Sequence, residues 1–359
     1  MKKRYAFLDV IRLFSMLGIV YYHMLISLYL CGIRQYDSIR PLFENNNIHI
    51  AKICVGLFFM ISGAGLMLST KDKEFKLKSY YLKRIVRILI PFYLVYILYL
   101  VSFMLLTHQG LDAVYSKDAS VFSIIFTFLG MDAYVSSFGI PTFSLGIGEW
   151  FLGALVMMYI VFPIIRWALL KSKWISLIFM SVYYIIILVT YPMMSYAKTV
   201  PGYVNFTCKI YEFFLGAFLI LIIDRIPKWV SLGVSIPCIL FVLFYPGNIL
   251  INENLLVMLV NVVFFLFFSG ENALFDKIPR VMKIIVFLCG YTYEFFLIHH
   301  VVIDYMTLQH IGVPFSNKQI PVLFVQEFLV ITILTALVKC ILSLPGIIKK
   351  RRRYVHTDI

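Results

Sequence analysis

Long apolar runs separated by short polar segments make up almost the whole chain. A membrane-spanning helix needs about 20 residues, and the runs divide into about ten spans of that length. The runs are continuous, whereas the strands of a transmembrane barrel alternate lipid-facing with lumen-facing residues. We therefore predict an all-α polytopic membrane protein that forms a single domain over residues 1–359. The predicted spans are residues 5–30, 51–69, 84–107, 149–166, 174–193, 206–223, 229–246, 253–269, 284–306 and 321–344.

The basic residues indicate which loops are cytoplasmic. Most of the 32 Lys and Arg residues fall in short clusters between apolar runs, which is typical of inner loops and tails. Both termini are then cytoplasmic, including a basic tail over residues 346–359, and the number of crossings must be even. On the outer side we place Arg34, Arg40, Lys52, Lys117, Lys198, Lys209 and Lys318.

One further apolar run, "SVFSIIFTFLGM" from Ser120 to Met131, is too short to cross the bilayer. Omitting it leaves the even number of crossings that the charges require. We therefore expect a re-entrant or interfacial segment within the outer connection of residues 108–148. Irregular backbone at membrane depth must be satisfied by protein or by a water-filled cavity.

Composition supports this assignment. The chain is 62% hydrophobic and 14% charged, and its mean hydropathy is +0.91. No small-residue cleavage site follows the basic N-terminus, so we expect a retained first span and no signal peptide. The net charge of +14 lies in loop clusters and does not indicate nucleic acid. The six cysteines are scattered without paired spacing, which favours small hydrophobes over a disulfide framework or a metal site.

The first span contains two polar residues that are costly in lipid. Arg12 and His23 are eleven residues apart, so on a helix they share a face and are separated by about 16.5 Å along the axis. Asp9 lies one turn before Arg12 and can orient it. The two residues either form part of a functional site on this face or have structural roles. In the structural alternative, Arg12 reaches the inner headgroups and His23 is a hydrogen-bonded histidine of the helix bundle.

Two arginines begin the third span, in "YYLKRIVRILIPFY". Arg84 and Arg87 lie three residues apart on one helix face. Anchoring at the inner headgroups is one explanation, although nearby lysines already supply it. A buried anion is the other, because guanidinium groups match phosphate with both charge and geometry.

Later spans carry acidic and imidazole groups. In "GYTYEFFLIHH", Glu294, His299 and His300 lie in an apolar span, with His299 at the outer level expected for His23. We expect His300 to serve packing. Glu149 begins the fourth span beside Trp150, and it is either a loop carboxylate or part of a site.

Arginines therefore gather at the cytoplasmic level, whereas imidazoles and a carboxylate gather at the outer level. A donor with phosphates at one end and a reactive group at the end of a long arm fits this order. Acyl-coenzyme A has both properties.

The same segments resemble the type 3 family of integral-membrane acyltransferases, which O-acylate sugars and related acceptors at bacterial envelopes. The resemblance covers nearly the whole chain and rests on several motifs in family order. They are "FLDVIRLFSMLGIVYYH", "VGLFFMISGAGLML", "LKRIVRILIPFY", "EWFLGALVMMYIVFP", "YEFFLGAFL" and "YTYEFFLIHH".

The resemblance implies about ten helices, an acyl-coenzyme A donor and a functional histidine at His23. Two departures change the expectation. No extracytoplasmic esterase-like domain follows the last span, so transfer is expected to be direct or through a separate partner. The motif around Glu149 is looser than the fuller Trp-x-Leu-xx-Glu pattern of some members.

We therefore expect a multi-pass cell-membrane enzyme that transfers an acyl group, most simply acetyl, from acyl-coenzyme A to a hydroxyl of an envelope or exported carbohydrate. The expected partners are this donor, the carbohydrate, the bilayer and glycan-synthesis proteins. We predict His23, Glu149 and His299 as catalytic residues, Arg12, Arg84 and Arg87 as donor-binding residues, and no metal ligands.

Two other functions fit the same residues. A proton-coupled transporter or a glycan exporter would also keep buried charges, and paired broken helices with an inverted repeat would indicate it. A structural partner of a glycan-synthesis complex is the third possibility, and it would not need His23.

Overall fold

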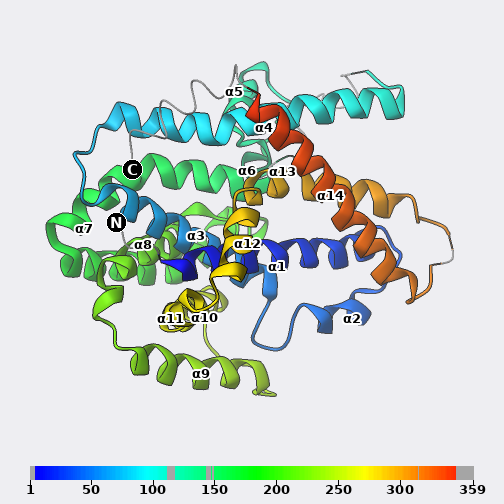
Figure 1. Ribbon diagram of the computed structural model, residues 1–359. Coiled ribbons are helices and arrows are strands. Elements are labelled where there is room, and N and C mark those ends of the chain that lie inside the picture. The colour runs from blue at the N-terminus through cyan, green and yellow to red at the C-terminus, as the bar shows by residue number, and fades with distance from the viewer. Residues whose placement is uncertain (1–4, 111–117, 143–146, 148, 314, 345–359) are drawn as a thin grey trace. The chain divides into compact units, whose positions relative to one another are not determined.

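The computed structural model describes residues 5–110, 118–142, 147, 149–313 and 315–344. For Glu149, Ser195, Tyr196 and Asp276 only the backbone is described. These ranges are helical, and their one β feature is an isolated bridge between Glu44 and His49 (Figure 1). The predicted tail, 346–359, lies outside the described residues.

Every predicted span coincides with helical backbone. The long elements are α1 (Ala6–Leu30), α3 (Ile50–Thr70), α4 (Leu77–Thr107), α7 (Glu149–Thr190), α8 (Phe206–Ile222), α9 (Lys228–Phe244), α10 (Glu253–Gly270), α12 (Pro279–Cys289), α13 (Thr292–Leu308) and α14 (Gln319–Ser343). The short helices are α2 (Tyr36–Ile39), α5 (Ile124–Leu129), α6 (Asp132–Ser136) and α11 (Asn272–Asp276). The 3-10 turns are η1 (Arg40–Leu42), η3 (Val121–Ser123), η4 (Tyr191–Met193), η5 (Ser195–Lys198) and η6 (Ile223–Arg225).

Length and apolarity make this an all-α polytopic membrane protein. In the described part of the chain, seven helices are long and apolar enough to cross a bilayer, and α12 with α13 forms a bent pair that adds an eighth. The apolar helix α9 has 17 residues, slightly fewer than the usual span. Ten crossings therefore stay a prediction.

Three predicted spans differ from simple separate helices. Residues 149–166 and 174–190 belong to one element, α7, which is interrupted at Ser172, where φ is −158° and ψ is 93°. The span expected over 284–306 is broken after α12, and its two helices are bent by 60°. At this break the amides of Gly290 and Tyr291 bond carbonyls three residues back, at 3.0 and 2.9 Å, so the chain leaves the α-helical pattern.

The chain forms two compact units. Unit 1 contains residues 1–29, 34–73 and 161–292, and unit 2 contains residues 30–33, 74–160 and 293–359. Unit 1 holds α3 and α8–α12 with nearly all of α1. Unit 2 holds α4–α6, the first part of α7, nearly all of α13, and α14.

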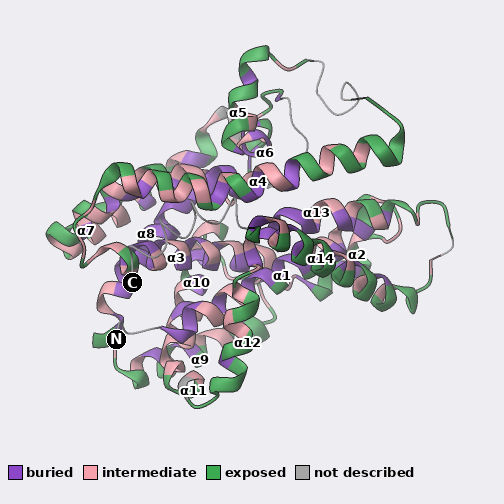
Figure 2. Ribbon diagram, turned by 45° about the horizontal axis from the view of Figure 1, so that its top comes forward, coloured by how far each residue is buried: buried purple, intermediate pink, exposed green. Residues whose placement is uncertain are grey.

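In unit 1, α3 and α8 pack through glycines. A Cβ on Gly63 would lie 2.0 Å from the carbonyl oxygen of Phe213, and one on Gly216 would lie 1.9 Å from that of Met60. Only glycine permits this approach of two backbones, as in other close helix pairs of membrane proteins. The "FFMISGAG" and "YEFFLGAF" motifs therefore contain the residues that join these helices, most of which are buried (Figure 2).

In unit 2, two tyrosine hydroxyls of α4 donate to backbone carbonyls of α7 that lie within one turn before Pro163. Pro163 of α7 has no N–H for the carbonyl of Tyr159, four residues back. The hydroxyl of Tyr80 on α4 donates to that carbonyl at 2.9 Å, and Tyr81 donates to the next one, of Ile160, at 2.9 Å. These bonds fix α4 against the first part of α7.

The run from Ser120 to Met131 is too short to span, as predicted. It forms η3 and α5, which end at Gly130 with a positive φ of 66°. The next helix, α6, packs closely on α7, because a Cβ on Gly153 of α7 would lie 2.4 Å from the side chain of Tyr134 on α6. A re-entrant or interfacial position stays a prediction.

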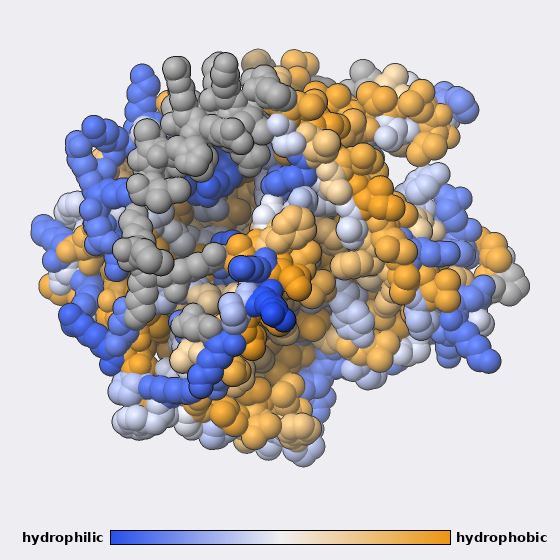
Figure 3. Space-filling model, in the orientation of Figure 1, coloured by the Kyte–Doolittle hydropathy of each residue, from blue (hydrophilic) through white to orange (hydrophobic). Residues whose placement is uncertain are grey.

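Large apolar side chains also remain exposed on the outward faces of the helices. Ile178 and Phe179 of α7 are 65% and 71% exposed, and Leu337 of α14 is 54% exposed. Figure 3 shows apolar side chains gathered over α14. Such surfaces are suited to lipid.

Candidate functional site

The predicted site residues divide between the two units. Arg12 and His23 belong to unit 1, whereas Arg84, Arg87 and His299 belong to unit 2. Glu149 also belongs to unit 2. Each set has a defined geometry within its own unit.

Arg12 lies on α1, and Asp9 orients it as the sequence predicted. Its guanidinium is 3.6 Å from the Asp9 carboxylate, and the two side chains are 37% and 16% exposed. The Asp9 carbonyl accepts from the thiol of Cys289 at 3.2 Å. One turn earlier, the amide of Phe7 donates to the side chain of Asn272 at 3.2 Å, which satisfies a donor that the helix start leaves open. The N-terminal end of α1, and Arg12 with it, is therefore held in unit 1.

His23 lies on the same continuous helix and joins an aromatic group. The ring of Tyr22 is 5.3 Å from that of His23, 5.2 Å from Phe43 and 5.0 Å from His49. His23 is half-buried, so its imidazole is partly accessible. A half-buried imidazole of this kind can accept a proton from a hydroxyl group.

His49 was missed by the sequence analysis because it precedes the second span in a polar segment. It sits before the first residue of α3. Burial, followed by the charge of Lys52, lowers the pKa of the His49 imidazole to about 4. His49 is therefore neutral at physiological pH and can pack among aromatic rings.

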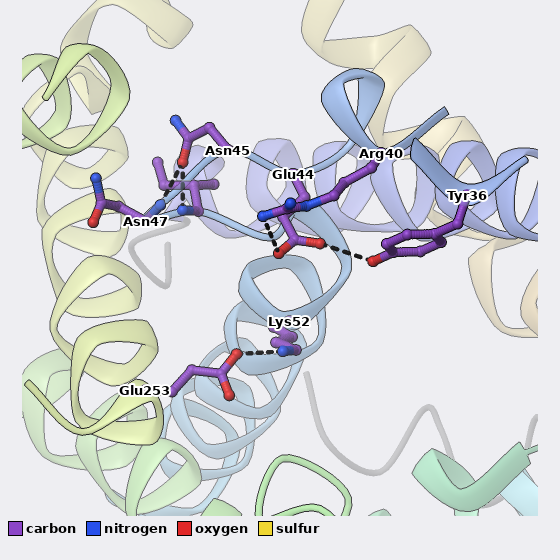
Figure 4. A network of polar contacts seen from close by, with 8 residues as sticks. Tyr36, Arg40, Glu44, Asn45, Asn47, Lys52 and Glu253 are labelled. Carbon is purple, nitrogen blue, oxygen red and sulfur yellow. Dashed lines mark hydrogen bonds and ion pairs between the residues drawn. The ribbon is translucent and has the colours of Figure 1, made fainter. Parts of the chain in front are cut away.

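Side-chain hydrogen bonds fix the turn that carries His49 (Figure 4). The Asn45 side chain accepts from the amides of Asn47 and Ile48 at 2.8 and 2.6 Å. The Asn47 amide group donates to the carbonyls of Tyr245 and Gly247 at 3.2 and 2.9 Å. These bonds attach the turn to the segment after α9, and so hold His49 beside Tyr22.

Other polar contacts surround the same turn. Tyr36 donates to Glu44 at 3.1 Å, and Arg40 lies 3.6 Å from that carboxylate. Lys52 at the start of α3 pairs with Glu253 of α10 (Figure 4). Two charges that we assigned to the outer side, Arg40 and Lys52, therefore have carboxylate partners in unit 1.

Arg84 is half-buried on α4 between two tyrosines of unit 2. Its guanidinium carbon is 5.9 Å from the ring centre of Tyr80 and 6.0 Å from that of Tyr159. Its Nε is buried and has no hydrogen-bond acceptor, and no carboxylate pairs with Arg84 in the described part of the chain. A partly desolvated cation without an anion is costly. This arrangement is suited to an anionic ligand.

Arg87, one turn later on the same helix, is exposed.

Glu149 begins α7, but its side chain lies outside the described part of the structure. Its predicted catalytic role therefore stays a prediction. The neighbouring Trp150 is half-buried, with its ring 6.3 Å from that of Phe151.

His299 and His300 have different environments on α13. His299 is fully buried, and its Nδ1 lies 2.6 Å from the carbonyl oxygen of Phe296. A carbonyl only accepts, so Nδ1 donates this hydrogen bond. We expected His300 to serve packing, but its Nδ1 lies 3.0 Å from the carboxylate of Asp304, and both side chains are partly exposed.

The structure also contains a buried polar group in unit 1 that the sequence analysis did not identify. Lys209, which we assigned to the outer side, is 2% exposed within α8 and lies 2.8 Å from Glu212, which is 1% exposed. Asn261 of α10 donates to the same carboxylate at 3.4 Å. The sequence signal was a glutamate inside the apolar run "YEFFLGAFL".

Unit 2 contains two more buried carboxylates. Glu294, singled out from the sequence, pairs with Lys339 of α14 at 2.9 Å. Glu327 of α14 is fully buried and accepts from Thr307 at 3.1 Å. Both contacts join α13 to α14.

Apolar helices of spanning length, with charged groups and the His299 imidazole buried among them, define a polytopic membrane protein with polar groups in its interior. A family model described as an acyltransferase domain matches residues 5–344. The chain therefore belongs to the type 3 acyltransferase family and is a membrane acyltransferase. Neither a curated protein nor a solved structure matched the chain.

Proposed function

We propose that this acyltransferase moves an acyl group, most simply acetyl, from acyl-coenzyme A to a hydroxyl of an envelope or exported carbohydrate. The observation that carries the donor assignment is Arg84. It is partly buried between tyrosine rings, without a carboxylate partner in the described residues. The phosphates of coenzyme A would supply the missing negative charge.

His23 is the proposed general base. It takes the proton of the acceptor hydroxyl as the oxygen attacks the thioester carbonyl, the new C–O bond forms, and the C–S bond breaks to release coenzyme A as a thiolate. A near-neutral imidazole suits this proton transfer. An acyl-histidine relay is the covalent variant of the same chemistry.

The other predicted residues have supporting roles in this proposal. Arg12 and Arg87 bind further phosphates of the donor. His299 orients the acceptor or stabilises charge during transfer, and Glu149 assists at the start of α7. The protein is proposed to lie in the cell membrane with both termini cytoplasmic, where the donor is made, and to cooperate with glycan-synthesis proteins.

A transporter was the main alternative from the sequence, and paired broken helices would have supported it. The described residues contain a single bent pair, α12 with α13. Membership of an acyltransferase family over residues 5–344 supports acyl transfer.

Calorimetry with coenzyme A on the purified protein tests the division of roles. We expect His23→Ala to leave coenzyme A affinity nearly unchanged, because the base acts only when the acceptor loses its proton. Arg12→Ala, or Arg84→Ala combined with Arg87→Ala, should weaken binding by roughly 1.5–3 kcal/mol for each charged hydrogen bond lost. Loss of binding in His23→Ala, with normal binding in the arginine variants, would refute this arrangement.

A further inference from the structure

We propose that Tyr80 and Tyr159 are positioning residues that hold the Arg84 guanidinium for a phosphate of the donor. The proposal rests on the proposed function for the identity of the donor. It adds two residues that no motif or charge pattern assigned to the site.

The Arg84 guanidinium lies close to two tyrosine rings. The guanidinium carbon of Arg84 lies 5.9 Å and 6.0 Å from the two tyrosine ring centres, at the outer limit of cation–π attraction. Tyr80 is 6% exposed, so its ring is fixed by packing. Contact with aromatic rings leaves the N–H groups at the edge of a guanidinium able to bind an anion in its plane.

A hydrogen bond holds Tyr80 and Tyr159 together. Pro163 deprives the carbonyl of Tyr159 of its helical partner, and the Tyr80 hydroxyl donates to that carbonyl at 2.9 Å. One hydrogen bond therefore links the two residues whose rings flank Arg84. Pro163, inside α7, thus leaves the Tyr159 carbonyl available to accept from Tyr80.

No structural ion pair occupies Arg84 in the described residues. In the described part of the chain it has no ion pair, and its Nε has no acceptor. A purely structural arginine would be expected to bond a carboxylate or a free carbonyl. Arg166 does so through its Nη2, which donates to the carbonyls of Thr70 and Lys73 at 2.9 and 3.1 Å. The two arginines therefore differ at these terminal N–H groups and not at Nε.

Tyr81 provides a matched control. It is adjacent to Tyr80, and its hydroxyl donates to the Ile160 carbonyl at the same distance of 2.9 Å. Its ring contacts that of Tyr80 at 5.1 Å, but it forms no cation–π contact with Arg84 among the described residues. Substitutions of Tyr81 therefore report the stabilising role without the positioning role.

The experiment measures affinity for coenzyme A, and separately for pyrophosphate, on the full-length protein in detergent. Tyr80→Leu should weaken both by between about 2-fold and 30-fold, the range of a cation–π contact. Tyr81→Leu should leave both affinities within about 2-fold of wild type. Tyr80→Phe keeps the ring and should bind nearly as well as wild type, while it lowers thermal stability as Tyr81→Phe does.

A double-mutant cycle separates positioning from general damage. In an Arg84→Ala background, Tyr80→Leu should cause no further loss, because the ring acts through the arginine. Arg84→Lys should not restore affinity, since lysine keeps the charge without the planar fork.

Each outcome decides the proposal. Equal losses in Tyr80→Leu and Tyr81→Leu, or additive losses with Arg84→Ala, would overturn it while leaving coenzyme A binding and the proposed function intact. If wild type binds pyrophosphate but not coenzyme A, and Tyr80→Leu weakens that binding, the positioning role stands and the donor assignment fails. Absence of binding to both probes would overturn both.

Discussion

The packing of α3 on α8 gives the sharpest structural prediction. Gly63 and Gly65 lie two residues apart on α3, yet a Cβ on Gly63 would be 2.0 Å from the Phe213 carbonyl oxygen, whereas one on Gly65 would meet nothing within 4 Å. An ordinary carbon–oxygen contact is about 3.4 Å. Gly63→Ala must therefore separate the two backbones by about 1.4 Å, or bend one of them.

Overpacking of this kind costs roughly 1–3 kcal/mol, and occasionally more. Gly65→Ala should instead gain up to about 1 kcal/mol, because alanine favours the helix over glycine. The two variants are thus expected to differ by about 1–4 kcal/mol in stability, although they make the same chemical change in the same helix. Gly216→Ala should resemble Gly63→Ala, since its Cβ would lie 1.9 Å from the Met60 carbonyl oxygen.

A thermal melt followed by a thiol-reactive dye measures the difference. Cys54 of α3 is 0% exposed and Cys208 of α8 is 3% exposed, so both become reactive when these helices separate. The exposed Cys340 reacts before the melt and sets the baseline. Gly63→Ala and Gly216→Ala should melt well below wild type, and Gly65→Ala at or above it. Equal melting of Gly63→Ala and Gly65→Ala would refute the close approach of α3 and α8.

Three further predictions follow from charge and topology. The pKa of the folded-state His49 imidazole is lowered to about 4, so between about pH 6.5 and 4 the unfolded chain binds more protons than the folded protein. The melting temperature should therefore fall as the pH is lowered through this window. A His49→Phe variant whose melting temperature depends on pH as steeply as that of wild type would contradict the assignment. Lys209→Met should destabilise by roughly 3–5 kcal/mol by leaving Glu212 charged and unpaired, and Lys209→Met with Glu212→Gln should recover much of this loss in denaturant titrations. Cysteines introduced at Ser116 and Ser136 should label from the same, outer side, whereas labelling from opposite sides would exclude ten crossings.

The apolar pattern predicted every long helix because it records where side chains meet lipid or protein. It also separated the spans 149–166 and 174–193 at the place where α7 is interrupted, at Ser172. It did not predict the bend after Cys289, because that bend depends on backbone conformation rather than on hydropathy. The residues on either side of Cys289 are apolar enough to continue a span, whereas Lys171 and Lys173 flank Ser172.

For the candidate site, spacing on one helix was informative. The Asp9–Arg12 pair follows from helical periodicity. The same spacing places Tyr80, four residues before Arg84, on the face of that arginine. Tyr159 could not be found in this way, because it reaches Arg84 from another helix. The burial of Lys209 could not be predicted, because its position near a span end does not show which way its side chain points, whereas the structure buries it against Glu212.

Transfer of labelled acetyl groups from acetyl-coenzyme A tests the central claim most directly. Membranes containing the wild-type protein should incorporate label into envelope carbohydrate. Membranes with equal amounts of His23→Ala should incorporate none, although that variant still binds coenzyme A. Undiminished incorporation by His23→Ala would contradict the assignment of His23 as the base. If the wild-type protein incorporates no label into any of the envelope carbohydrates supplied, the assignment as an O-acyltransferase is contradicted.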